Sequence, residues 1–243
     1  MTDYRTVLAL MSGGLDSTTL VSHLQVQGYH VQGIHFTYGS NHEDAETRAL
    51  NAVAKRLKVQ LHSIDISELD LFKGGKSSLM GQAPVPAEEY QEVEHEGPSN
   101  TVVPFRNGVM ISMAVAKANS LGLDTVAVGV HANDHSHWAY PDCSPEFMGP
   151  MTGAVYAGTF HEVRLITPFI WFTKSDLVTI AQMIHAPLEA TYSCYNGREV
   201  SCGVCPTCQE RIAAFKQAGL IDPIDYEISV DWGDCSPWQL AMF

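Results

Sequence analysis

Short apolar runs alternate with amphipathic stretches along most of the chain. A short continuous apolar run is typical of a strand buried on both faces, whereas apolar residues recurring every three or four positions are typical of a helix. The predicted strands cover residues 7–11, 30–38, 59–64, 124–130 and 162–166. The predicted helices cover residues 18–27, 42–58, 108–120, 144–156, 173–184 and 210–218. This alternation predicts an α/β fold with a doubly wound, mainly parallel sheet.

Polar residues mark the starts of several predicted helices. Asn41 and Ser144 are predicted N-caps, and Thr173 begins a capping box that Asp176 would complete. Arg106 and Lys174 lie at the starts of their helices, where a positive charge opposes the helix dipole. A nearby anion would stabilise such a charge, so we expect Arg106 to contact a ligand and Lys174 to have an anionic neighbour.

Glycine and proline interrupt the pattern between residues 73 and 100, which also contains an acidic run. Loops of this length inside a compact domain are usually functional or disordered, so 73–100 is predicted to be a flexible surface loop. These changes divide the chain into an α/β domain at 1–190, a small helical subregion at 191–226 and a tail at 227–243. The tail contains several large apolar residues, which could cover a core edge or form a subunit contact, and we expect a homodimer.

Charge and hydropathy narrow the possible functions. The chain has 243 residues and a formal net charge of −13. Proteins that bind nucleic acids usually carry a basic surface, so this charge disfavours a broad contact with phosphate backbones. No apolar run approaches the roughly 20 residues that cross a membrane, and the N-terminus lacks the pattern of a signal peptide. We therefore expect a cytoplasmic protein without membrane attachment.

A glycine-rich turn, SGGLDS at residues 12–17, joins the first predicted strand to the first helix. It lacks both the Walker A pattern and the G-x-G-x-x-G pattern of dinucleotide-binding proteins. Its glycines permit a tight turn and close approach of a ligand, and backbone N–H groups at a helix start attract an anion. The alternative is an ordinary turn. The sequence matches SGGxDS, the pyrophosphate loop of ATP pyrophosphatases, which cleave ATP between its α- and β-phosphates and adenylate a substrate.

Four cysteines lie close together in the predicted subregion, at positions 194, 202, 205 and 208. Four thiolates can form a closed tetrahedral zinc site, and the absence of a further local ligand predicts a structural role. An iron–sulfur cluster is the main alternative, because the spacing partly resembles ferredoxin-like runs, and a C-x-x-C redox pair is another. In a chain expected to be cytoplasmic, metal binding is favoured over disulfides.

Residues 131–143 follow the fourth predicted strand and are rich in histidine, aromatic and polar residues. The carboxyl end of a parallel strand is a common place for a ligand pocket. The three histidines at 131, 135 and 137 leave a second metal site open as an alternative, although histidines in polar loops often only form hydrogen bonds.

The chain resembles the 7-cyano-7-deazaguanine synthase family from Ser12 to about Tyr226. The motifs that carry the resemblance are SGGLDSTT at 12–19, Tyr-Gly at 38–39, Arg-Asn at 106–107, Tyr-Pro-Asp-Cys at 140–143 followed by Glu-Phe, Thr-Lys at 173–174, and Ser-Cys-Tyr-Asn-Gly at 193–197 leading to C-x-x-C-x-x-C. Three features depart from the family pattern. Phe105 replaces a usual glycine, Ser40 replaces a usual glutamine, and 131–138 is longer and richer in histidine. These departures concern the substrate pocket rather than the adenylation chemistry.

The resemblance implies an adenine nucleotide alpha hydrolase-like fold, in which 1–190 is the ATP-pyrophosphatase domain. It implies that 7-carboxy-7-deazaguanine, ammonia and ATP give 7-cyano-7-deazaguanine, AMP and pyrophosphate. The residues expected to bind ATP are Leu10, Met11, Ser12, Gly13, Gly14, Leu15, Asp16, Ser17 and Thr18. Those expected to bind the deazaguanine substrate are Tyr38, Arg106, Asn107, Tyr140, Asp142 and Glu146. Asp16, Lys174 and Arg106 are the expected catalytic residues, with Mg²⁺ on Asp16, and zinc would bind Cys194, Cys202, Cys205 and Cys208.

Three other functions remain open at this point. An enzyme of the same fold could thiolate tRNA, although that reaction needs a sulfur carrier and a basic RNA-binding face. The enzyme could stop at the amide, 7-amido-7-deazaguanine. A non-catalytic nucleotide-binding or zinc-ribbon adaptor is the third, and the complete SGGLDS sequence argues against it.

Overall fold

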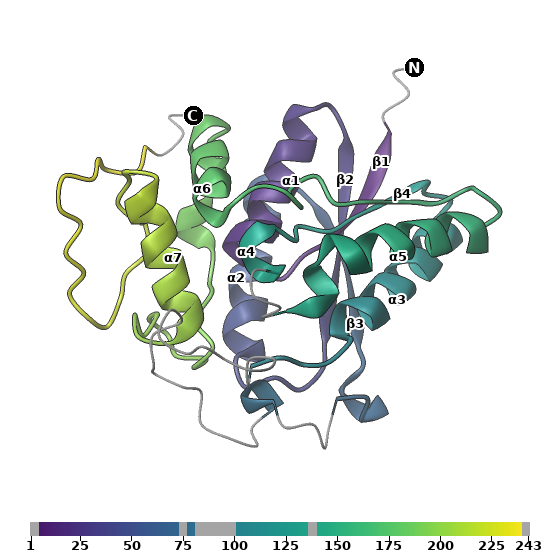
Figure 1. Ribbon diagram of the computed structural model, residues 1–243, viewed down its shortest axis with the longest axis horizontal. Coiled ribbons are helices and arrows are strands. Elements are labelled where there is room, and N and C mark those ends of the chain that lie inside the picture. Colours follow the sequence, from purple (N-terminus) through teal and green to yellow (C-terminus); the bar gives the residue numbers. More distant parts are fainter. Residues whose placement is uncertain (1–4, 73–76, 81–100, 136–139, 240–243) are drawn as a thin grey trace.

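A single parallel sheet organises the computed structural model, which describes residues 5–72, 77–80, 101–135 and 140–239 (Figure 1). Its strands are β1 (Thr6–Leu10), β2 (His30–Thr37), β3 (Gln60–Asp65), β4 (Thr125–Ala127) and β5 (Arg164–Ile166). Their order is β3-β2-β1-β4-β5, and every pair is parallel. The predicted doubly wound α/β fold is confirmed.

Helices cover both faces of the sheet (Figure 1). The α-helices are α1 (Leu15–Val26), α2 (Glu43–Leu57), α3 (Arg106–Leu121), α4 (Ala132–His135), α5 (Pro145–Gly158), α6 (Lys174–Met183) and α7 (Pro206–Gln217). Short 3-10 helices cover Ser67–Leu69, Ser78–Met80, Pro141–Cys143 and Leu188–Ala190. Helices α1, α2, α6 and α7 contribute to one hydrophobic cluster, and α3 and α5 contribute to the other.

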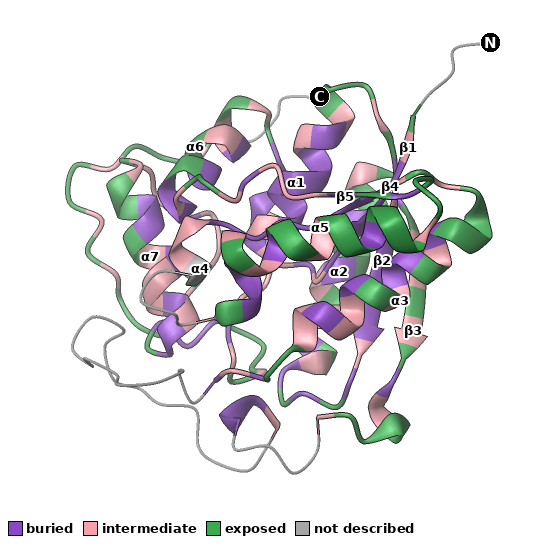
Figure 2. Cartoon of the chain, turned by 45° about the vertical axis from the view of Figure 1, so that its right-hand side comes forward, coloured by how far each residue is buried: buried purple, intermediate pink, exposed green. Residues whose placement is uncertain are grey.

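The central strand separates these two clusters. Side chains alternate between the faces of a strand, so Val7 and Ala9 pack into the first cluster while Leu8 packs into the second. All three are fully buried, and Figure 2 shows the buried colour concentrated along the inner strands. Burial on both faces explains why this strand is a continuous apolar run in the sequence.

Two of the predicted helix caps are confirmed. The side chain of Ser144 accepts a hydrogen bond from the backbone N–H of Phe147, at 3.1 Å. Thr173 and Asp176 form the reciprocal capping box at the start of α6. These caps depend on residues three positions apart, so local sequence is sufficient to predict them.

The predicted N-cap of α2 is wrong. His42 occupies that position, while the Asn41 amide donates to the backbone carbonyl of Ser78 at 2.9 Å. The Glu43 carboxylate accepts the backbone N–H groups of Tyr38 and Gly39, at 2.8 and 2.7 Å. Asn41 therefore ties the start of α2 to a distant segment, a contact that local pattern does not reveal.

The strand order reverses between β1 and β4, because β2 and β3 extend the sheet on one side and β5 on the other. In open α/β sheets, ligands bind at the carboxyl ends of the strands beside such a switch point. Strand β4 is shorter than predicted, and Val128 to Val130 leave the sheet here to line a cavity. Most of the predicted flexible loop at 73–100 lies outside the described residues. Within them, no helix is long and apolar enough to cross a bilayer.

Candidate active site

A cavity of about 270 Å³ lies at the carboxyl ends of β1, β2 and β4. One wall is the turn between β1 and α1, and a second is formed by the starts of α3 and α6. The segment around the four cysteines and the first residues of α7 form a third wall. The cavity therefore joins the predicted ATP loop to parts of the chain nearly 200 residues away.

The turn at 12–17 presents polar groups to this cavity. Ser12 and Ser17 bring their hydroxyl oxygens within 3.3 Å of each other, and the backbone N–H of Gly14 donates to the Ser12 hydroxyl. Gly14 is the N-cap of α1 and provides no side chain to cap it. First-turn N–H groups have no acceptor within their own helix, so this turn is suited to binding an anion.

Gly13 packs the back of the turn against α2. Its φ of +81° lies in the left-handed region, and a Cβ atom there would lie 2.5 Å from the backbone nitrogen of Leu50. The turn thus needs glycine for both its conformation and its packing.

Asp16 lies at the centre of a charged group at the start of α1. Its carboxylate is 3.5 Å from the Nζ atom of Lys174 and 3.5 Å from the Nε2 atom of His131. Lys174 also donates to the carboxylate of Glu210 from α7, at 2.7 Å. Burial raises the pKa of Asp16, but the charges of Lys174 and His131 outweigh it and hold this pKa below its ordinary value. Asp16 is therefore ionised, and the expected anionic neighbour of Lys174 is present.

Arg106 lines the opposite part of the cavity. It donates to the Tyr38 hydroxyl at 3.0 Å, and its guanidinium carbon lies 5.8 Å from the centre of the Tyr38 ring. Among the described residues, no carboxylate lies within 4 Å of Arg106. A half-buried guanidinium with this environment is suited to binding an anionic ligand, as its position in the sequence predicts.

Two tyrosines stand near this arginine. The hydroxyls of Tyr140 and Tyr195 are 3.3 Å apart, and Tyr140 also bonds to the Thr101 hydroxyl at 2.9 Å. Both rings line the cavity. They provide hydroxyl groups and flat apolar surfaces, a combination suited to a planar heterocycle.

The Tyr-Pro-Asp-Cys segment holds the start of α3. Asp142 accepts the backbone N–H of Asn107 at 2.8 Å, and the Asn107 side chain donates to the sulfur of Cys143 at 3.1 Å. Phe105, the departure from the family pattern, has a φ of +60° and packs its ring edge-on against Phe147. A left-handed phenylalanine is strained, and the glycine that the family resemblance leads us to expect here would adopt this φ without that strain.

The structure brings most of the predicted residues together, although not all. The predicted ATP residues that line the cavity are Leu10, Met11, Ser12, Gly14, Leu15, Asp16 and Ser17. Gly13 lies behind the turn and Thr18 is buried within α1. The predicted substrate residues that line it are Tyr38, Arg106, Asn107 and Tyr140. Asp142 lies behind Asn107, and Glu146 is exposed at the start of α5.

Sequence reasoning missed several residues that line the cavity. These are His35, His42, Glu46, Tyr195 and Glu210. The Nδ1 atom of His35 lies 3.0 Å from the Met11 carbonyl oxygen. Because a carbonyl oxygen only accepts, Nδ1 carries the hydrogen and donates it. The tautomer therefore has Nε2 as an acceptor. The sequence could have indicated some of them. Strand β2 ends at the same edge of the sheet as β1, so polar residues at and after its end are candidates for lining a ligand pocket.

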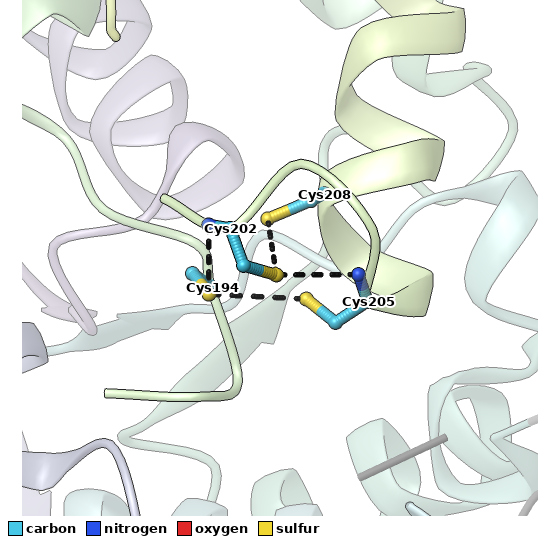
Figure 3. A group of neighbouring side chains, drawn as sticks. All are labelled: Cys194, Cys202, Cys205 and Cys208. Atoms are coloured by element: carbon cyan, nitrogen blue, oxygen red, sulfur yellow. Dashed lines mark hydrogen bonds between the residues drawn. The ribbon is translucent and has the colours of Figure 1, made fainter. Parts of the chain in front are cut away.

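The four cysteines form one compact, buried group (Figure 3). Their sulfur atoms lie within 4.8 Å of one another, with two pairs at 3.9 and 4.0 Å. A tetrahedral zinc ion with Zn–S bonds of about 2.3 Å would separate its sulfur ligands by roughly 3.8 Å. An iron–sulfur cluster distributes its thiolates over several irons and would hold them further apart. The group thus fits a single zinc ion, and Cys143 and Cys235 are not part of it.

A buried ion pair ties this region to the rest of the chain. Arg211 of α7 and Asp222 are almost fully buried, and two hydrogen bonds of 2.7 and 3.0 Å join them. Arg211 also donates to the hydroxyls of Thr191 and Ser193, and Tyr226 donates to Asp222. These hydrogen bonds therefore hold together the segments that precede and follow the cysteines.

Comparison with known proteins reveals extensive similarity. The sequence profile of the family described as queuosine biosynthesis protein QueC matches residues 6–219. The 7-cyano-7-deazaguanine synthase of Methanoculleus marisnigri is 40% identical over 222 residues, covering 90% of this chain and 98% of that protein. The synthase of Pseudoalteromonas atlantica is 37% identical over 224 residues, covering 91% and 98%. Among solved structures, NMN synthetase from Francisella tularensis has a TM-score of 0.48 at 12% identity, covering 87% of this chain and 73% of that one.

Proposed function

The chain belongs to the QueC family of queuosine biosynthesis proteins, whose curated members are 7-cyano-7-deazaguanine synthases, and we propose that its cavity carries out that reaction. The chain is thus an ATP-dependent ligase of the adenine nucleotide alpha hydrolase-like fold. It joins ammonia to 7-carboxy-7-deazaguanine and forms the nitrile, with release of AMP and pyrophosphate. The alternative of a non-catalytic adaptor does not fit a family of ligases.

The observation that carries the proposal is the meeting of two anion-binding elements in one cavity. The turn at 12–17 offers N–H groups and hydroxyls on one side, and Arg106 offers a guanidinium on another. ATP and a carboxylate substrate both carry negative charge, so each can occupy a separate complementary region. Proximity of two bound reactants is itself a large part of catalysis in such a transfer.

The chemistry requires activation because a carboxylate is a poor electrophile. Attack of a carboxylate oxygen on the α-phosphorus of ATP releases pyrophosphate and gives an acyl adenylate. Ammonia displaces AMP from it and gives the amide. The amide oxygen is adenylated in turn, and loss of AMP with the remaining N–H protons gives the nitrile. The protein binds both partners and neutralises the charge that develops on pyrophosphate.

Within this scheme, the residues have distinct roles. Ser12, Gly14 and Ser17 hold the ATP phosphates, and Lys174 neutralises charge on the departing pyrophosphate. Arg106 binds the substrate carboxylate. Asn107, Tyr38 and Tyr140 hold the deazaguanine ring, and Asp142 orients Asn107. The ionised Asp16 carboxylate would hold the Mg²⁺ that accompanies ATP.

The assembly and location of the enzyme are further parts of the proposal. Exposed aromatic residues on the surface, including Phe160 at 90% and Trp171 at 74% exposure, support a homodimer. Six free cysteines support a reducing compartment, the cytoplasm. A net charge of −13 disfavours a basic binding face, so the proposal includes no nucleic-acid partner.

Product analysis tests this proposal directly. Purified protein incubated with 7-carboxy-7-deazaguanine, ammonium and ATP should give a product with the mass of the nitrile, and two molecules of AMP for each nitrile. Accumulation of the amide as the end product would support the enzyme that stops early. An absence of carboxylate-dependent AMP release would contradict the assignment altogether.

Zinc is proposed to hold the cysteine group together and to act structurally. We expect Cys208→Ser to reduce bound zinc from about one equivalent to nearly none, because a closed site loses most of its affinity with one thiolate. Elemental analysis measures the zinc, and thermal unfolding measures the effect on stability. Cys235→Ser is the matched control, since this thiol lies outside the group and should leave both values unchanged. Full zinc occupancy in Cys208→Ser would contradict the assigned ligand set.

A further inference from the structure

Three carboxylates line the cavity among the described residues, and only two of them are paired with a lysine. Asp16 and Glu210 both lie near the Nζ atom of Lys174, at 3.5 and 2.7 Å. Glu46 of α2 is the third. Its near neighbour is the Nε2 atom of His42, at 3.7 Å. Glu46 is thus the lining carboxylate that no permanent cation neutralises at close range.

Glu46 has a defined position relative to the two substrate regions. It precedes Leu50 by four residues, so the two lie on one face of α2. Leu50 packs directly against Gly13 of the phosphate turn. On its other side, Glu46 lies within electrostatic range of Arg106 and Tyr38. Glu46 therefore lines the cavity from the helix that packs against the turn at 12–17, within electrostatic range of Arg106.

The titratable groups near Glu46 come from α2, α3 and the end of β2. Burial raises the pKa of Glu46 to about 7, Arg106 from α3 lowers it, and Glu43 from α2 raises it. Tyr38, at the end of β2, has its own pKa raised by burial. Burial and Arg106 lower the pKa of His42 to about 4, so this imidazole is neutral at pH 7. A carboxyl in this setting can both gain and lose a proton near neutral pH.

The proposed reaction has to remove protons from the substrate nitrogen within this cavity. When ammonia attacks the acyl adenylate, the new C–N bond forms, the C–O bond to AMP breaks, and the nitrogen must lose a proton. When the adenylated amide becomes the nitrile, the nitrogen loses its last protons. The electrons of the final N–H bond form the triple bond, and those of the C–O bond leave with AMP. Each step therefore needs an acceptor beside the substrate nitrogen.

The geometry points to Glu46 as the general base that accepts protons from this nitrogen, with the His42 imidazole 3.7 Å from its carboxylate. The inference rests on the proposed function, since it assigns a residue to that reaction. Its separate content is the identity of the base, which lies on α2 rather than in the phosphate turn or the family's Tyr-Pro-Asp-Cys segment. Glu46 would accept one proton at a time and return each to solvent before it accepts the next. The first comes as ammonia displaces AMP, and two more come as the adenylated amide becomes the nitrile.

Glu46→Gln tests the inference because glutamine keeps the size of the side chain and cannot accept the proton. We expect the rate of nitrile formation to fall by roughly 10²–10⁴-fold, while ATP binding and zinc content stay unchanged. The rate of the native enzyme should rise with pH through about 7, and Glu46→Gln should lose this limb. Asp44→Asn, an exposed change on the same helix, should keep the native rate and profile.

The outcomes separate this inference from the proposed function. If the native protein makes no nitrile, the proposed function fails. If the native protein makes nitrile and Glu46→Gln makes it at the same rate with the same pH profile, only the base assignment is overturned. If Glu46→Gln does not fold, Glu46→Asp decides. A native limb near pH 7 that Glu46→Asp displaces supports Glu46, and an unmoved or absent limb overturns it.

Discussion

Replacing Asp16 by asparagine is expected to lower carboxylate-dependent pyrophosphate release by about 10²–10³-fold, the usual cost of losing one preorganised electrostatic contact. Asparagine keeps the shape of the side chain but removes the charge that faces Lys174 and His131. It also removes the proposed ligand of the Mg²⁺ that accompanies ATP. A coupled assay for pyrophosphate, with and without 7-carboxy-7-deazaguanine, measures the effect.

Asp124→Asn provides the control for this experiment. Asp124 is exposed and immediately precedes β4, at the edge of the sheet opposite the cavity. Its replacement should leave pyrophosphate release unchanged. Thermal unfolding of both variants shows whether the charge group around Asp16 also contributes to stability. Native turnover in Asp16→Asn, in a folded protein, would remove this carboxylate from the catalytic residues.

The second large effect is expected on stability, from Asp222→Ala. This change leaves the Arg211 guanidinium buried without its carboxylate, and breaking such a pair costs about 3–5 kcal/mol. In a chain of this size the melting temperature should fall by roughly 6–20 °C. Calorimetry or circular dichroism measures it. Asp225→Ala, an exposed change three residues along, should have little effect.

A double replacement distinguishes an unpaired charge from lost packing. Arg211→Met combined with Asp222→Leu removes both charges and leaves none unpaired, so part of the stability lost in Asp222→Ala should return. Arg211 also bonds to Thr191 and Ser193, and the return should therefore be incomplete. A double variant less stable than Asp222→Ala would show that these other hydrogen bonds matter more than the ion pair.

The sheet and the phosphate turn could be predicted because their signals are local. The apolar run from Val7 to Met11 predicts a strand that is buried on both faces. Gly13 and Gly14, shortly after it, predict a tight turn whose backbone conformation favours glycine. The capping box at Thr173 is equally local, since both partners lie within one turn of helix. The conformation of the turn followed from these short stretches, and its binding of ATP phosphates stays a prediction.

The remaining parts of the site depend on contacts between distant segments. Asn41 was predicted as a helix cap because asparagine is common there, yet its amide bonds to Ser78, 37 positions along the chain. The acidic residues after it suit the start of any helix, so the sequence did not reveal that Glu46 faces a cavity. Likewise, the position of Lys174 in the first turn of a helix predicted an anionic neighbour, but the sequence did not identify Glu210 of α7 as that neighbour.

The contact between Gly13 and Leu50 has a consequence for how this protein can evolve. Any side chain at position 13 would meet main-chain atoms, which cannot rotate aside as a neighbouring side chain could. The turn would have to shift into the cavity, where the proposed nucleotide lies, so the new side chain and the ligand would compete for the same space. Packing alone therefore prevents substitution at position 13, independently of any selection that acts on the catalytic groups.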